Sequence, residues 1–276
     1  MERHTPRPQA LLRDKVFLHM PSVYDAIGGR LVQLLVFEAV YVGGNVTGWA
    51  SAVTEPLLRM TEQVRLAGDV AQSMAIPLVV DAGAGFGEPL HSMRSVREFI
   101  RVGVAGIHIE DQLYPKRAHC HKYVVHGIPV DEFVEKIALA CRQREQRDPD
   151  FISIARTDTC RALGLDGASL RLDRAAEVGA DLGMLFPRTP AEAERAPQRC
   201  RLPLVYVQSR GNRDGRPIFS RQELPHMGYV ACIEAQVIPS TAFHFLKPAL
   251  TALRQTGRYT GMTRPGRLRR GRQSRI

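Results

Sequence analysis

Two acids and one arginine stand at the ends of three short apolar runs. Asp81 follows Pro-Leu-Val-Val, Glu110 follows Gly-Ile-His-Ile, and Arg156 follows Ile-Ser-Ile-Ala. Such runs predict buried parallel strands, whose carboxyl ends meet at one edge of a sheet or barrel. Two carboxylates there would repel each other unless a divalent cation lay between them, and hard oxygen ligands select Mg²⁺ or Mn²⁺. We therefore expect Asp81 and Glu110 to bind such a cation.

A second group of residues is suited to binding an anionic substrate. The planar guanidinium of Arg156 fits a carboxylate. The segment Gly43, Gly44 and Asn45 follows another apolar run, and its backbone N–H groups can approach an anion closely because two of its residues lack side chains. Together these residues predict a carboxylate-binding site beside the cation.

Each of these residues also has a plain structural interpretation. A strand-terminal residue such as Asp81 is commonly a helix cap or turn former. The glycine-rich run that follows it could be a simple turn, and Arg156 could be a structural partner of Asp158 or Asp181. It is the combination at correlated strand ends that favours a functional site.

The segment from Tyr114 to Tyr123 concentrates cations and groups that can transfer protons. It contains Lys116, His119, Cys120 and His121. One interpretation is a solvated basic loop, since charged loops commonly lie at the surface. The other is a lid that carries acid–base groups to the substrate, and a histidine is favoured as the acid or base because its pKa lies near neutrality.

The elements that must position these residues alternate along the chain. Short apolar runs are followed by longer segments with helical spacing, about eight times in roughly 250 residues, which matches a (β/α)8 TIM barrel in count and size. A doubly wound open sheet is the alternative, but it requires a glycine-rich turn after the first strand that this chain lacks.

We expect strands at residues 16–19, 39–42, 77–81, 106–110, 151–156, 182–186, 203–207 and 233–238. The helices are expected at residues 24–35, 59–74, 90–102, 130–144, 167–178, 191–195, 221–227 and 241–254. The barrel should be a single catalytic domain over residues 1–262, followed by a basic, disordered tail at 263–276.

Four segments of the chain resemble the isocitrate lyase/phosphoenolpyruvate mutase superfamily. They are Val80–Gly87, Gly103–Gln112, Pro115–Arg117 and Ile154–Asp158, in the same order and spacing, with weaker similarity from about residue 22 to 241. The resemblance implies a (β/α)8 barrel that binds Mg²⁺ and an α-keto or 2-hydroxy carboxylate. It also implies dimers or tetramers, so a homo-oligomer is expected.

The resemblance implies roles for individual residues. Asp81 matches the direct metal ligand and Glu110 a direct or water-mediated one. Arg156 matches the carboxylate-binding arginine, Gly43 to Asn45 match the loop that holds the substrate's oxyanion, and residues 115–122 match a gating loop. An acid usually follows the second strand of the family, and Glu55 stands near that place as a further metal ligand.

The chain also departs from the family pattern. Gly83 stands where a second aspartate is usual, and Phe186 stands where a glutamate often ends the sixth strand. Lyases of the family use a cysteine in the gating loop as general acid. Here that place is Ala118, followed by His119, and Cys120 is displaced by two residues.

The resulting hypothesis is a Mg²⁺-dependent lyase that cleaves or forms a C–C bond of an α-keto or 2-hydroxy di- or tricarboxylate through a metal-stabilised enolate. Lys116 with its neighbour Arg117 favours cleavage. The alternatives are a phosphoenolpyruvate or carboxyphosphonoenolpyruvate phosphonomutase, an oxaloacetate decarboxylase or hydrolase, and a barrel that binds a carboxylate without turnover.

Composition limits the remaining function classes. The formal charge is +10, and the six arginines of residues 263–276 supply more than half of it. No nucleic-acid recognition motif accompanies this tail, so we do not expect nucleic acid as a partner, although retention by the arginines remains an alternative. No apolar run reaches the roughly 20 residues that a bilayer requires. Five scattered cysteines and an N-terminus without a signal peptide predict a reduced, cytoplasmic protein.

Overall fold

The computed structural model describes residues 8–14, 17–117, 124–209 and 215–258. In this part of the chain, eight parallel strands form one sheet. They are β1 (Leu18–Pro21), β2 (Val40–Val42), β3 (Leu78–Asp81), β4 (Gly106–Glu110), β5 (Ile152–Arg156), β6 (Leu182–Met184), β7 (Leu204–Gln208) and β8 (Ala231–Glu234).

The strands follow chain order around a nearly closed ring, β1-β8-β7-β6-β5-β4-β3-β2. The ends of this order approach each other at a parallel bridge between Ser22 and Tyr41, where the Val23 N–H donates to the Tyr41 carbonyl at 2.9 Å. An open doubly wound sheet reverses its strand order part-way, and this one does not. The predicted (β/α)8 barrel is therefore confirmed.

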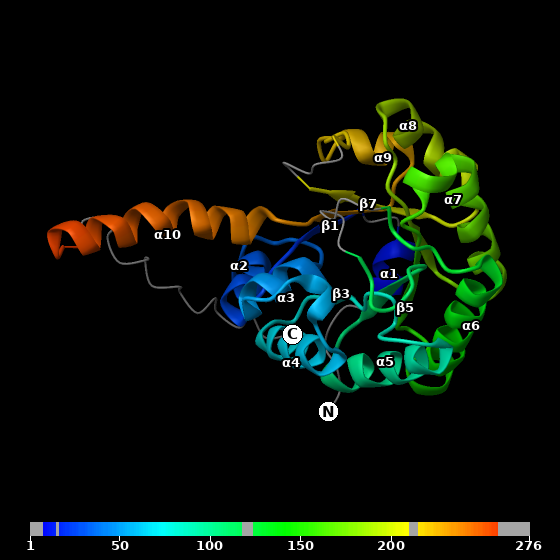
Figure 1. The fold of residues 1–276 in the computed structure, drawn as a ribbon, viewed down its shortest axis with the longest axis horizontal. Coiled ribbons are helices and arrows are strands. Elements are labelled where there is room, and N and C mark those ends of the chain that lie inside the picture. The colour runs from blue at the N-terminus through cyan, green and yellow to red at the C-terminus, as the bar shows by residue number, and fades with distance from the viewer. Residues whose placement is uncertain (1–7, 15–16, 118–123, 210–214, 259–276) are drawn as a thin grey trace. The chain divides into compact units, whose positions relative to one another are not determined.

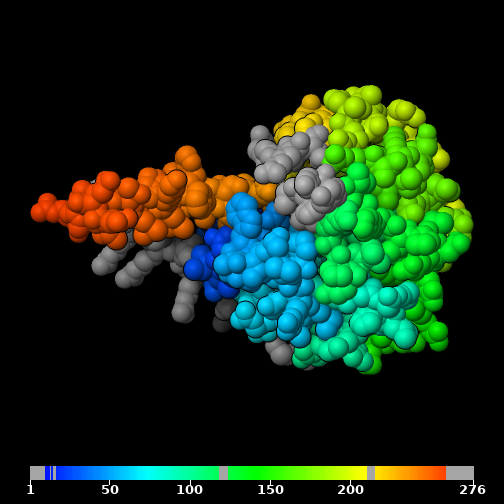
Figure 2. All heavy atoms as spheres, in the orientation of Figure 1, coloured from blue at the N-terminus to red at the C-terminus, as the bar shows by residue number. Residues whose placement is uncertain are grey.

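Helices connect the strands and cover their outer side. Figure 1 shows α4 to α8 following one another around the strands, and Figure 2 shows the same succession on the surface, from cyan through green to yellow. The helices are α1 (Pro8–Arg13), α2 (Ala26–Leu34), α3 (Gly44–Ser51), α4 (Met60–Ser73), α5 (Pro89–Val102), α6 (Val130–Arg147), α7 (Cys160–Glu177), α8 (Pro190–Arg199), α9 (Glu223–Met227) and α10 (Val237–Thr256), with the 3₁₀ helix η1 (Glu55–Leu57) after α3. No helix among these is long and apolar enough to span a membrane.

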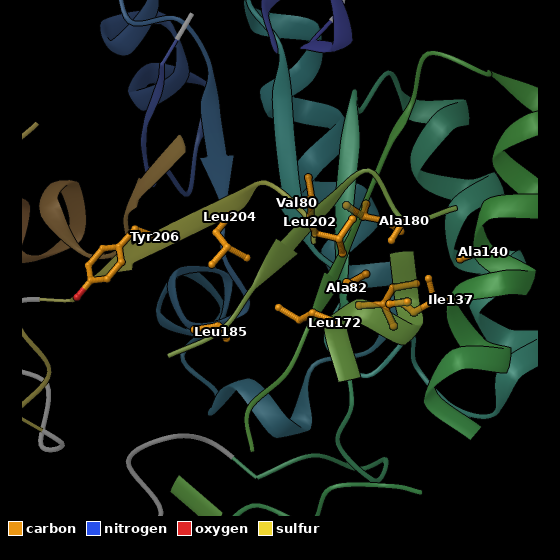
Figure 3. Packing of buried hydrophobic residues seen from close by; sticks show 14 of the residues in the cluster. Val80, Ala82, Ile137, Ala140, Leu172, Ala180, Leu185, Leu202, Leu204 and Tyr206 are labelled. Carbon is orange, nitrogen blue, oxygen red and sulfur yellow. The ribbon is translucent and has the colours of Figure 1, made fainter. Parts of the chain in front are cut away.

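Alternate strand residues point to two separate apolar layers. One layer fills the barrel and includes Val79, Ile152 and Ile154. The other lies between strands and helices, and Figure 3 shows part of it, including Val80 of β3, Leu204 of β7 and Leu172 of α7. Successive side chains of a strand point to opposite sides of the sheet. Residues an even number of positions away from a first-layer residue in the same strand, or an odd number away from a second-layer residue, therefore point into the barrel. That set includes Asp81, Glu110 and Arg156.

Several predicted elements differ from those observed, and three of the differences bear on the fold or the site. Gly44 and Asn45 were expected in a loop, but they begin helix α3, for which Gly43 is the cap. Helix α7 begins seven residues earlier than predicted and is kinked at Gly164, whose φ is +68°. The last strand lies at Ala231–Glu234 instead of 233–238, and α10 begins at Val237, inside the predicted range.

The chain divides into two compact units, residues 1–238 and 239–276. The first contains the barrel. In the second, α10 presents an apolar stripe, Phe243, Leu246, Leu250 and Leu253, all exposed. The predicted tail at 263–276 lies outside the described residues.

Candidate active site

The predicted acids meet at the carboxyl ends of β3 and β4, around the ammonium of Lys116. Lys116 Nζ lies 2.5 Å from Glu55 Oε1, 3.1 Å from both carboxylate oxygens of Glu110, and 3.9 Å from Asp81 Oδ1. All four side chains are at least 85% buried. Three carboxylates from three different segments therefore converge on one point, and a cation already lies among them.

Arg156 closes this cluster from β5, which pairs with β4 so that Arg156 stands directly opposite Glu110. Its Nη1 lies 3.0 Å from Glu110 Oε2 and 3.6 Å from Asp81 Oδ2. The rest of the guanidinium donates to Asp158, through Nε at 2.9 Å and Nη2 at 3.1 Å. Asp158, one of the two structural partners considered from the sequence, is thus observed beside Arg156. Nη1 is the nitrogen that lies beside Glu110 and Asp81.

The N-terminus of α3 borders the cluster. The Gly44 N–H donates to Asp81 Oδ2 at 3.2 Å, and the Gly83 N–H donates to Asp81 Oδ1 at 2.7 Å. A Cβ at Gly44 would lie 2.5 Å from Glu55 Oε1, so only glycine allows helix and acid to approach this closely. Asn45 is exposed. The helix dipole adds partial positive charge on this side.

Burial and neighbouring charge act in opposite directions on the acids. Burial raises the pKa of Glu110 to about 8 against the opposing effect of Arg156 and Lys116, and burial also raises the pKa of Glu55. For Asp81, burial is outweighed by Lys116, His108 and Arg156, which hold its pKa below the usual value. The same acids raise the pKa of Lys116 in spite of its burial. Lys116 is therefore an ammonium, and it offsets part of the negative charge of the three acids.

A buried histidine lies next to the acids. His108 Nε2 is 2.7 Å from the Tyr41 hydroxyl, and its Nδ1 is 3.7 Å from Asp81 Oδ1. Burial lowers the pKa of His108 to about 3, so the ring is neutral. The negative charge of Asp81 favours a proton on Nδ1, which leaves Nε2 to accept from Tyr41.

A pocket of about 330 Å³ opens beside the cluster. One side is polar, with Glu55, Asp81 and Lys116, and the other is apolar, with Leu58, Phe86 and Tyr114. An anionic small molecule with an apolar substituent matches both sides.

The donor set fits a divalent cation. Glu110 Oε1 is fully buried and, although 3.1 Å from Lys116 Nζ, accepts no hydrogen bond from the described residues. The cluster holds four acids, counting Asp158, against the two cations Lys116 and Arg156, which leaves two formal negative charges when all four acids are ionised. Oxygen ligands and that charge suit Mg²⁺. Glu55, Asp81 and Glu110 are the residues that would hold it, after Lys116 withdraws.

The structure brings together most of the predicted site. Glu55, Asp81, Glu110, Lys116, Gly44 and Arg156 lie in one cluster, whereas His119, Cys120 and His121 lie outside the described residues. Sequence reasoning missed Tyr41 and His108. His108 stands two residues before Glu110 in the same strand, and strand alternation alone places both on the inner side of the barrel.

The comparisons with known proteins agree with this geometry. A family model described as phosphoenolpyruvate phosphomutase matches residues 9–258. The chain belongs to this family. It is 34% identical over 224 residues to 2,3-dimethylmalate lyase of Eubacterium barkeri, covering 79% of this chain and 75% of the relative. It is 31% identical to the chloroplastic carboxyvinyl-carboxyphosphonate phosphorylmutase of Arabidopsis thaliana, covering 92% and 74%. Among solved structures, an oxaloacetate acetylhydrolase bound to 3,3-difluorooxalacetate superposes with a TM-score of 0.88 at 27% identity, covering 93% and 88%.

This family membership confirms the resemblance inferred from the sequence. A lyase, a mutase and a hydrolase are similar to the chain at comparable identity, and all three names refer to carboxylate chemistry. Choosing among these reactions requires an argument from the site itself.

Proposed function

We propose that this protein is a Mg²⁺-dependent carbon–carbon lyase that acts on a 2-hydroxy or α-keto di- or tricarboxylate. The observation that carries the proposal is the convergence of Glu55, Asp81 and Glu110 around one buried point, where no residue in the described part of the chain donates a hydrogen bond to Glu110 Oε1. The apolar side of the pocket, formed by Leu58, Phe86 and Tyr114, favours a substrate with an alkyl branch. That preference supports the lyase over the mutase and the hydrolase.

A divalent cation held by Glu55, Asp81 and Glu110 would supply Lewis-acid stabilisation of the negative charge that develops on the substrate. Arg156 Nη1 and the N-terminus of α3 orient the substrate carboxylate, which lowers the entropic barrier before reaction. Glu55, Asp81 and Glu110 lie at the reacting end, and the buried site excludes water. In the cleavage direction the substrate hydroxyl loses a proton and the C–C bond breaks. Its electron pair leaves with the departing carbon, which then takes up a proton.

The proton donor and acceptor belong to the same proposal. The sequence favours His119, Cys120 or His121 for this role, with histidine preferred. All three follow Lys116 closely in the chain.

The assembly and location of the protein are further parts of the proposal. The stripe on α10 at residues 243, 246, 250 and 253 has the spacing of a helix that packs against another helix. It supports a homo-oligomer. The four described cysteines are buried free thiols, which agrees with a reduced, cytoplasmic protein.

A substrate panel tests the proposed activity. Purified protein should turn over at least one alkyl-branched 2-hydroxy dicarboxylate with Mg²⁺ and not with a chelator, and Asp81→Ala should abolish that turnover. Phosphonopyruvate and oxaloacetate belong in the panel, since preferred turnover of either would assign the mutase or hydrolase reaction. Carboxylate binding without turnover across the panel would contradict an enzymatic function.

A further inference from the structure

Three residues with metal-binding side chains lie together on the outer face of the β1–β8 pair. His19 of β1 stands directly opposite Cys232 of β8, and Glu234 follows Cys232 by two residues. Residues two apart in a strand point to the same side. The His19 nitrogen, the Cys232 sulfur and a Glu234 oxygen all lie within 4.8 Å of one another.

The separation of two of these atoms already suits a shared metal ion. His19 Nε2 lies 3.2 Å from Glu234 Oε1. Two ligands bound tetrahedrally at typical zinc–nitrogen and zinc–oxygen distances lie about 3.3 Å apart. A sulfur ligand would stand about 3.5 Å from the nitrogen, so the cysteine needs to move by an ångström or so. Cys232 is buried, while the side chains of His19 and Glu234 keep 17% and 22% of their area exposed.

Neighbouring groups hold the glutamate in place. The Gln208 side-chain amide donates to Glu234 Oε1 at 2.8 Å, and the Phe219 N–H donates to Gln208 Oε1 at 2.7 Å. Hydrogen bonds of this kind orient the carboxylate ligands of metal sites.

We propose that His19, Cys232 and Glu234 form a second metal site, which takes a zinc-like ion. Its sulfur and nitrogen donors separate it from the candidate active site, whose donors are oxygens suited to Mg²⁺. The two sites also lie on opposite sides of the sheet. Cys232 belongs to the outer apolar layer, whereas Asp81 points to the same side as Val79, which belongs to the inner layer.

Binding exchanges protons for the ion. The neutral His19 ring binds the ion through Nε2 with its proton on Nδ1, the Cys232 thiol releases its proton to solvent, and water completes the coordination. Because β1 and β8 are the first and last strands of the barrel, the ion ties the two ends of the barrel sequence together. It should therefore stabilise the folded protein in proportion to its saturation.

Cobalt is the probe for this site, because a thiolate bound to Co²⁺ gives a charge-transfer band. Titration of the full chain should produce this band with one equivalent bound. The band should disappear in Cys232→Ala and His19→Gln. It should persist in Cys200→Ala, which removes another buried thiol, and in Asp81→Ala, which removes an acid of the candidate active site. Gln208→Leu should weaken Co²⁺ binding about 10- to 100-fold.

Thermal unfolding with zinc provides a second readout. With excess Mg²⁺ present to occupy the candidate active site, zinc should raise the midpoint of the wild type and leave that of His19→Gln unchanged, which gives an answer even if Cys232→Ala does not fold. Absence of the cobalt band in the wild type, or its persistence in both His19→Gln and Cys232→Ala, would overturn the proposal.

Discussion

Lys116 occupies the place among three carboxylates where a metal cation is expected. Removing its charge in Lys116→Met leaves those acids without their main partner, and breaking a buried ion pair costs roughly 3–5 kcal/mol. We expect the metal-free variant to be destabilised by an amount of that order. Mg²⁺ should then raise its melting midpoint by more than it raises that of the wild type.

Lys136→Met is the matched control, since Lys136 is also buried but donates to the Ala84 carbonyl at 3.0 Å, apart from the three acids. It should lose stability without any change in its response to Mg²⁺. Equal Mg²⁺ shifts for wild type and Lys116→Met would show that the ammonium and the cation do not compete.

The lowered pKa of His108 predicts how the stability of the folded protein depends on pH. Its pKa is about 3 in the folded state, against 6.5 for an ordinary histidine. Between pH 6.5 and pH 3, His108 is therefore protonated in the unfolded chain and neutral in the folded chain. Stability is lost as pH falls below about 6.5 because protonation favours the unfolded chain. From pH 7 to pH 5 this residue alone should lower the free energy of unfolding by about 2 kcal/mol.

Urea unfolding at the two pH values checks this prediction. The fall in unfolding free energy from pH 7 to pH 5 should be smaller in His108→Gln by the contribution of this residue. It should be the same as in the wild type in His226→Gln, which alters an exposed histidine. If His108→Gln loses as much stability as the wild type, the histidine is not held neutral.

At the scale of elements, strands were easier to predict than the segment that completes the site. Continuous apolar runs located seven strands within two residues at each end. β4 was predicted without error, because burial on both faces leaves a clear pattern. The start of α3 was missed, because Gly-Gly-Asn has low helix propensity and its helix is set by contacts with Asp81 and Glu55. The position of Lys116 among three acids depends on segments that are far apart in the sequence, and no local sequence pattern reveals it.

Two glycine variants separate the role of α3 from general stability. In Gly44→Ala the new Cβ meets Glu55 Oε1 at 2.5 Å, so kcat/KM should fall at least tenfold, or about 1.4 kcal/mol. Gly103→Ala is the comparison: Gly103 caps α5 with φ of +96°, and its nearest contact would be 3.7 Å away. It should cost roughly 1 kcal/mol of stability and leave kcat/KM unchanged. Equal losses of kcat/KM in the two variants would show that the N-terminus of α3 does not contribute to the site.

At the scale of the whole molecule, the apolar stripe of α10 predicts self-association. Leu246→Asp with Leu250→Asp places two charges on the stripe, and light scattering after size-exclusion chromatography should show a smaller assembly than the wild type. Thr241→Asp with Gln255→Asp adds the same charge to the opposite face of the helix and should leave the assembly unchanged. A monomeric wild type would contradict the prediction.

The central claim is that Asp81 and Glu110 together hold a divalent cation at the mouth of the barrel. Calorimetric titration of the full-length protein with Mg²⁺, in the presence of oxalate as a substrate-like dianion, tests it most directly. We predict one Mg²⁺ bound per chain by the wild type, and affinity at least tenfold weaker in both Asp81→Asn and Glu110→Gln. Mg²⁺ binding that is absent from the wild type, or unchanged in both variants, would contradict the account.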